Sequence, residues 1–95
     1  MSKIETIKEI ITPIAIQYGL KRIYLFGSYA KGKAKETSDV DLLISTEITG
    51  LKFFGLVEAL RTGLRKKVDV LNQEQLKVNN ELVQEILNDG VRIYG

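Results

Sequence analysis

The apolar residues of this chain recur with two different periods. A period of three to four residues, which is typical of one buried face of a helix, marks three segments. These segments are residues 3–18, 51–65 and 79–88. Gly19 and Gly90 follow the first and the last of them, and glycine is a frequent residue just past a helix end. The pattern therefore predicts three amphipathic helices.

The ends of these helices carry further signals. Ser2 and Glu5 have the spacing of a capping box at the start of the first helix. Asn79 or Asn80 is expected to cap the last helix, because asparagine accepts a hydrogen bond from the first backbone N–H groups. Pro13 lies inside the first helix and removes one backbone donor, so we expect a kink there.

Short runs of strand-forming residues lie between the helices. These runs cover residues 22–26, 39–44 and 67–71, with 91–94 as a last short strand. The small and basic stretch 29–35 is expected to form one or two helical turns and then a loop. The order of elements predicts a single α/β or α+β domain over residues 1–95, with helices packed on a small sheet.

The composition excludes several kinds of chemistry. The chain contains neither cysteine nor histidine. Disulfides, zinc sites built from Cys and His, and nucleophilic mechanisms that need a histidine base are therefore excluded. The remaining side-chain ligands are hard oxygens, which suit Mg²⁺, Mn²⁺ or Ca²⁺.

Hydropathy and charge narrow the class of protein further. An apolar fraction of 44% and a charged fraction of 27% are those of a globular domain. No apolar run reaches the ~18 residues of a membrane span, and the N-terminus lacks the apolar core of a secretory signal. A net charge of +2 is too small to indicate a nucleic-acid partner. We therefore expect a cytoplasmic protein that contacts no membrane.

Two aspartates stand at the start of the second predicted strand. Asp39 and Asp41 point to the same face of an extended chain, while Val40 between them points into the core. Carboxylates about 6–7 Å apart repel each other unless a cation lies between them. Taken alone, Asp-x-Asp is more often a turn residue followed by a solvated strand residue. Its position before a buried Leu-Leu-Ile run favours a cation site.

Two further features lie on the neighbouring strands. Gly27 and Ser28 follow the first strand, where a glycine lets a phosphate approach the backbone and a serine adds a donor. An ordinary turn with Ser28 as a helix cap is the other interpretation. Asp69 alternates with the valines of the third strand, so it either joins the aspartate pair or forms a solvated ion pair with Lys66 or Lys67.

Together these residues resemble a known signature. Residues 27–41 contain Gly-Ser, a spacer and Asp-x-Asp, and a third carboxylate follows on a later strand. This set resembles the signature of the DNA polymerase β-like nucleotidyltransferase superfamily, and residues 38–44 look like its small prokaryotic branch, the minimal nucleotidyltransferases. The resemblance covers roughly residues 20–72 and implies the polymerase β-like palm, a small mixed sheet with helices packed on it.

The resemblance implies a role for each residue of the signature. Gly27 and Ser28 would hold the triphosphate of ATP. Asp39 and Asp41 would bind two Mg²⁺ ions, and Asp69 would bind the catalytic one and help to deprotonate the acceptor hydroxyl. A carboxylate can serve as this base because metal coordination lowers the pKa of a hydroxyl.

One residue departs from the family pattern. Lys31 stands where many relatives carry arginine. A lysine still attracts phosphate, but as a point charge without the two-pronged geometry of a guanidinium group. A solvated loop lysine is the simpler interpretation of this position.

The acceptor is implied by the same branch. Members that are paired with a HEPN-domain ribonuclease toxin act as antitoxins and transfer AMP from ATP to a tyrosine of that toxin. A small-molecule transferase of the antibiotic type is an alternative, although such enzymes carry an additional domain. Two further alternatives are a non-catalytic antitoxin and a plain interaction domain. The presence of all three carboxylates disfavours the non-catalytic antitoxin. Both a homo-oligomer and a hetero-oligomer with the toxin fit the sequence.

Overall fold

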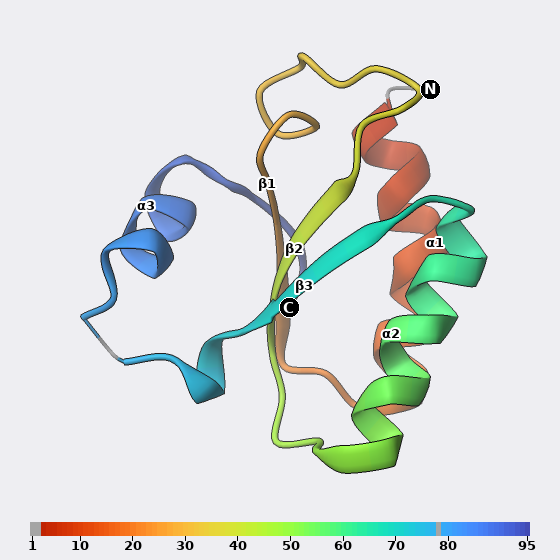
Figure 1. Ribbon diagram of the computed structural model, residues 1–95, viewed down its shortest axis with the longest axis vertical. Helices are drawn as coiled ribbons and strands as arrows, with labels where there is room; N and C mark the ends of the chain where they lie inside the picture. Colours follow the sequence, from red (N-terminus) through yellow and green to blue (C-terminus); the bar gives the residue numbers. More distant parts are fainter. Residues whose placement is uncertain (1–2, 78) are drawn as a thin grey trace.

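The computed structural model describes residues 3–77 and 79–95, and a four-stranded sheet lies at its centre with the strand order β3-β2-β1-β4 (Figure 1). The strands are β1 (Arg22–Phe26), β2 (Val40–Ser45), β3 (Val68–Asn72) and β4 (Val91–Tyr94). The helices are α1 (Lys3–Tyr18), α2 (Gly50–Leu64) and α3 (Glu81–Asp89), with a short 3-10 helix η1 (Gln73–Gln75) after β3. The three longer helices and the four strands expected from the sequence are thus confirmed, and η1 is added.

The sheet is mixed, as the resemblance implied. Strand β1 pairs antiparallel with both β2 and β4, whereas β2 pairs parallel with β3. The parallel pair is possible because α2 carries the chain back along the sheet between the two strands. A backbone hydrogen bond from Val40 N to Lys67 O, 3.0 Å long, extends this pairing at the start of both strands.

Helices cover both faces of the sheet. On one face α1 and α2 lie side by side, and on the other face α3 lies alone (Figure 1). Strand β2 is buried from both sides: Leu42 and Ile44 belong to the core under α1 and α2, while Leu43 packs with Val83 and Ile86 of α3. Because β2 is a central strand with apolar neighbours on both faces, its position in the sheet is strongly determined.

The helix ends agree with the sequence in most details. The side chain of Asn80 accepts a hydrogen bond from Val83 N at 3.2 Å and so caps α3, one of the two caps expected. Arg65, at φ 55°, ends α2 in the left-handed conformation. The capping box expected at Ser2 lies outside the described residues. Pro13 lies within α1 as expected, and the kink there stays a prediction.

Among the described helices, none combines the length and the apolar character needed to cross a membrane.

The stretch 29–35, expected to form one or two helical turns and then a loop, forms no regular helix. Residues 27–32, called here the Gly27 turn, are turns, and an irregular loop follows to Asp39. Lys31 N does donate to Gly27 O at 3.2 Å, as in one helical turn. Gly32, however, has φ +70°, and this left-handed conformation ends any helical progression. The single turn and the loop after it agree with the prediction, and a longer helix does not form.

A buried asparagine joins the ends of β2 and β3. Asn72 is 6% exposed, and its Oδ1 accepts hydrogen bonds from Thr46 N at 3.3 Å and Glu74 N at 3.1 Å. Its Nδ2 donates to Thr46 O at 3.0 Å. Three backbone groups thus depend on one amide side chain, which also starts η1.

We expect Asn72→Ala to lower the free energy of unfolding by about 2–4 kcal/mol, because buried backbone donors and an acceptor lose their partners. Urea unfolding followed by circular dichroism measures this change. The matched control is Asn79→Ala at an exposed position, which should change stability by less than about 0.5 kcal/mol. Similar small changes for both variants would contradict this account of Asn72.

Candidate active site

The sheet brings two of the three candidate aspartates together. Asp41 of β2 is the register partner of Asp69 of β3 in the parallel pair. Asp39 lies directly before β2 and is half-buried. In the antiparallel pair Asp41 stands opposite Phe26, the last residue of β1. The end of β1 and the beginnings of β2 and β3 therefore meet at one edge of the sheet.

Asp41 is electrostatically strained. Partial burial raises the pKa of its carboxyl group, repulsion from the carboxylates of Asp69 and Asp39 raises it further, and a hydrogen bond with the Asp69 side chain adds to the effect. Two carboxyl groups form a hydrogen bond only when one of them holds a proton. A divalent cation relieves the same repulsion without a proton.

Gly27 makes room for this carboxylate. Its φ of +72° lies in the left-handed region, which side chains disfavour. A Cβ atom at this position would overlap the carboxylate of Asp41. Two independent constraints thus require glycine here, and the Asp41 carboxylate occupies the space that a side chain would need.

The structure changes the interpretation of Ser28 and Lys31. Ser28 cannot be a helix cap, because no helix follows it. It is half-buried, and its backbone oxygen accepts a hydrogen bond from Lys33 N at 2.9 Å. Lys31 is exposed and lines a cleft together with Gly27. Both residues therefore lie on the Gly27 turn, whose first residue contacts Asp41, and their roles stay predictions.

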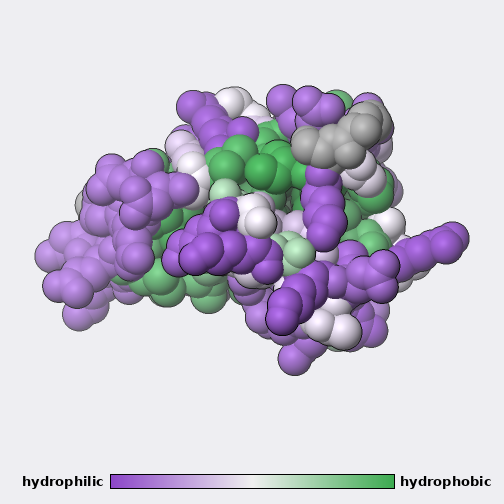
Figure 2. Space-filling model, turned by 90° about the horizontal axis from the view of Figure 1, so that it is seen from above, coloured by the Kyte–Doolittle hydropathy of each residue, from purple (hydrophilic) through white to green (hydrophobic). Residues whose placement is uncertain are grey.

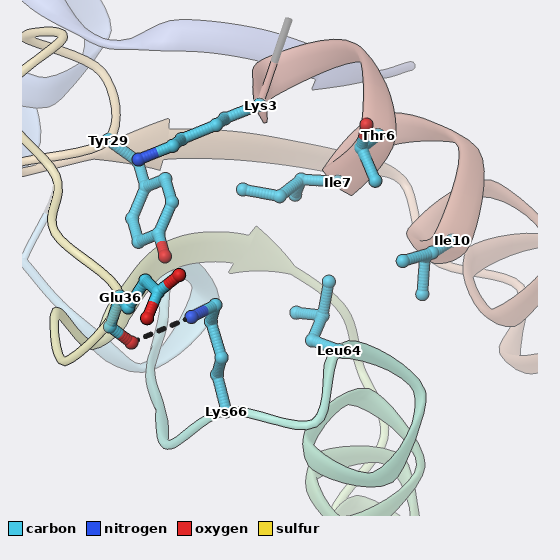
Figure 3. Close-up of a pocket in the computed structure, with 8 residues that line it drawn as sticks. All are labelled: Lys3, Thr6, Ile7, Ile10, Tyr29, Glu36, Leu64 and Lys66. Carbon is cyan, nitrogen blue, oxygen red and sulfur yellow. Dashed lines mark hydrogen bonds between the residues drawn. The ribbon is translucent and has the colours of Figure 1, made fainter. Parts of the chain in front are cut away.

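Two lysine side chains bind backbone carbonyls of the loop before Asp39, contacts that the sequence pattern does not predict. Lys3 Nζ donates to Ala34 O at 3.1 Å, and Lys66 Nζ donates to Glu36 O at 2.8 Å. Figure 3 shows both lysines around a cleft of about 220 Å³, into which the ring of Tyr29 points. No sequence signal could reveal these bonds, because their acceptors are backbone carbonyls about thirty residues away along the chain.

The ion pair considered for Asp69 is not found. In residues 3–77 and 79–95, no salt bridge joins Asp69 to Lys66 or Lys67. Lys66 is engaged by the loop instead. Asp69 is exposed, and its side chain faces Asp41. Of the two interpretations of Asp69, the structure favours membership of the aspartate group.

The donor set fits Mg²⁺, although the side chains do not already form a closed cage. Within the described residues, no group of three carboxylates is arranged as a ready metal-binding site. Asp41 and Asp69 are in contact, and Asp39 acts on Asp41 through charge. Mg²⁺ commonly binds through one or two carboxylates and completes its shell with waters and substrate phosphates, so a fully formed protein cage is not required.

Comparison with known proteins identifies the family. The family model described as "Polymerase beta, Nucleotidyltransferase" matches residues 6–95. The chain belongs to this family. It is therefore an enzyme of the nucleotidyltransferase class, and the resemblance inferred from its signature is confirmed.

Individual relatives agree with this assignment. Protein adenylyltransferase MntA of Thermococcus cleftensis is 39% identical over 83 residues, which cover 81% of this chain and 84% of that protein. A crystal structure of a toxin-antitoxin with AMP-PNP contains a chain that is 25% identical, with a TM-score of 0.75, over 93% of this chain and 73% of that one.

A third similarity concerns the fold alone. The structure of a tri-AMPylated HEPN toxin of Shewanella oneidensis in complex with an MNT antitoxin contains a chain with a TM-score of 0.69 and 22% identity. The match covers 97% of this chain and 72% of that one. The mixed sheet with three helices is therefore the fold of these nucleotidyltransferases.

Replacing Asp41 by asparagine tests the electrostatic strain. The raised pKa means that charged Asp41 destabilises the fold above that pKa, and that this cost disappears as the pH falls through it. Without metal, we expect Asp41→Asn to raise the free energy of unfolding at pH 7, with a gain that shrinks towards pH ~4, the ordinary range of an aspartate.

Urea unfolding in EDTA at several pH values measures this gain. Glu9→Gln, on the exposed face of α1, is the control and should change stability by less than about 0.5 kcal/mol. A metal-free Asp41→Asn protein that is less stable than the wild type at pH 7 would show that Asp41 is a structural residue.

Proposed function

We propose that this chain is an Mg²⁺-dependent protein adenylyltransferase that transfers AMP from ATP to a tyrosine of a partner HEPN toxin and thereby acts as an antitoxin. The observation that carries the proposal is the contact of Asp41 with both Asp69 and the Gly27 turn. It gathers carboxylates for cations beside a turn whose backbone N–H groups are proposed to bind phosphates. A relative named protein adenylyltransferase and a neighbour holding AMP-PNP support the choice of group and nucleotide.

The aspartates and the turn have separate tasks in this proposal. Asp39, Asp41 and Asp69 would hold two Mg²⁺ ions, which when bound acidify the acceptor hydroxyl and offset charge on the leaving pyrophosphate. The backbone of Gly27 and the hydroxyl of Ser28 bind phosphate oxygens, and the glycine lets the Asp41 carboxylate lie directly against this turn.

The transfer step needs no histidine, because a carboxylate can take the proton of the acceptor hydroxyl. The acceptor oxygen forms a bond to the α-phosphorus of ATP as the bond to pyrophosphate breaks. Asp69 takes the hydroxyl proton, because it is the exposed member of the aspartate group and so faces an incoming acceptor. Lys31 on the turn attracts the polyphosphate as a point charge.

A protein acceptor fits the surface better than a small one. The clefts that border the Gly27 turn and the loop after it measure about 220 and 260 Å³. Pockets that enclose a small-molecule ligand are usually about 300–1,000 Å³. A partner protein supplies the missing wall and its own hydroxyl, in a hetero-oligomer with this chain. The use of ATP as the donor supports the cytoplasm as the proposed location of this reaction.

Mass spectrometry of the partner tests the proposal. After incubation with ATP and Mg²⁺, we expect the co-encoded toxin to gain one or a few AMP units on tyrosine. Asp41→Asn should slow the transfer at least ~100-fold, since loss of a metal ligand removes the ion from its place. Glu9→Gln, remote from the aspartates, should react like the wild type.

Two outcomes would overturn the proposal. A toxin that is bound and inactive but unchanged in mass would identify a non-catalytic antitoxin. AMP found on a small alcohol and not on the toxin would identify a small-molecule transferase.

A further inference from the structure

A second cleft, distinct from the one in Figure 3, lies between the Gly27 turn and α3. It measures about 260 Å³ and is called here the α3 cleft. Phe26, Gly27 and Lys31 line it from the side of the turn. Helix α3 forms the opposite wall, and its last turn is held close to β1: a Cβ atom on Gly90 would lie only 3.0 Å from Leu25 O.

One face of α3 forms this wall. Leu82, Glu85, Ile86 and Asp89 follow each other at helical spacing, so all four project towards the cleft. Ile86 is buried at its base, but Leu82 is 45% exposed, which leaves a large apolar side chain uncovered. In Figure 2 apolar surface is visible beside the hydrophilic surface of α3. The wall is thus apolar in the middle and acidic at two points.

The α3 cleft is continuous with the aspartate group. Gly27 lines the cleft and also lies directly against the Asp41 carboxylate. A nucleotide whose phosphates are bound at Asp41 and Gly27 therefore has its remaining part within reach of the cleft. The volume is below that of pockets for drug-sized ligands, so it suits one planar ring system and not a whole nucleotide.

The charged side chains that line the α3 cleft determine which part of the nucleotide binds there. Glu85 and Asp89 repel a polyphosphate, whereas Lys31 on the opposite side attracts it. The phosphates are therefore kept on the turn, and an uncharged ring faces α3. A carboxylate accepts hydrogen bonds and donates none, so it favours a ring that carries an amino group. Leu82 and Ile86 supply apolar contact for the ring's face.

We propose that the α3 cleft binds the nucleobase of the triphosphate and that Glu85 and Asp89 select a base with an exocyclic amino group. Adenine presents such a donor at N6, whereas hypoxanthine presents a carbonyl oxygen at the same position. This inference rests on the proposed nucleotidyltransfer and adds the base specificity of that site.

Calorimetric titration with ATP and with ITP, both in Mg²⁺, tests the proposal. The wild type should bind ATP about tenfold or more tightly than ITP, the scale of a hydrogen bond to a charged group. The double variant Glu85→Gln, Asp89→Asn carries amides, which both donate and accept hydrogen bonds. Its affinities for ATP and ITP should therefore differ by no more than about threefold.

Two further variants sharpen the test. Glu81→Gln changes an exposed carboxylate of the same helix outside the cleft and should keep the wild-type ratio. Leu82→Ala removes the apolar contact and should weaken ATP and ITP alike, with no change in their ratio. Melting curves confirm that each variant is folded, as expected for changes at exposed positions.

The outcomes separate this inference from the function on which it rests. Equal affinity of the wild type for ATP and ITP, or an unchanged ratio in the double variant, would overturn the base assignment while nucleotide binding stands. Absence of binding by either nucleotide in Mg²⁺ would overturn the proposed function itself.

Discussion

The approach of the Asp41 carboxylate to the bare backbone of Gly27 constrains the rest of this structure. It requires a residue without Cβ at the end of β1, in a left-handed conformation. It also requires the antiparallel register in which Asp41 stands opposite Phe26. A slip of β2 by one residue would turn Asp41 into the core and replace it by Leu42, because the side chains of a strand alternate between its faces.

The core opposes the strain that this arrangement creates. Asp41 is held near two like charges, and the repulsion between Asp41 of β2 and Asp69 of β3 favours separation of these strands. Directly after it, Leu42, Leu43 and Ile44 are at most 1% exposed and pack against helices on both faces of the sheet. At the other end of β2 and β3, the Asn72 side chain forms hydrogen bonds with the backbone of Thr46. Apolar burial and these hydrogen bonds hold a group of charges that only a cation would favour.

The local patterns of the chain were sufficient for much of the fold. Helices and strands followed from apolar periods, and the adjacency of Asp69 to Asp41 followed from a strand-helix-strand crossover. The aspartates and Gly27 were identified because a short, specific signature contains them. Their individual roles in metal and phosphate binding stay predictions, since no similarity assigns a role to a single residue.

What the sequence did not reveal depends on long-range packing. The stretch 29–35 was expected to form one or two helical turns, and only the left-handed conformation of Gly32 shows why no longer helix forms. Lys66 looked like an ion-pair partner of Asp69 but bonds to a backbone carbonyl of the loop. Glu85 had no recognisable place in the signature, because the α3 cleft forms only when the last helix packs beside the Gly27 turn.

The melting temperature with ATP in Mg²⁺, compared with ATP in EDTA, tests most directly the claim that the aspartate group and the Gly27 turn bind a metal–nucleotide complex. At about one hundred times its Kd, ATP with Mg²⁺ should add ~2.7 kcal/mol of stability. For a domain of this size, each kcal/mol raises the melting temperature by roughly 4–8 °C. A much smaller shift in EDTA is the predicted result, and equal shifts with and without the metal would contradict the account.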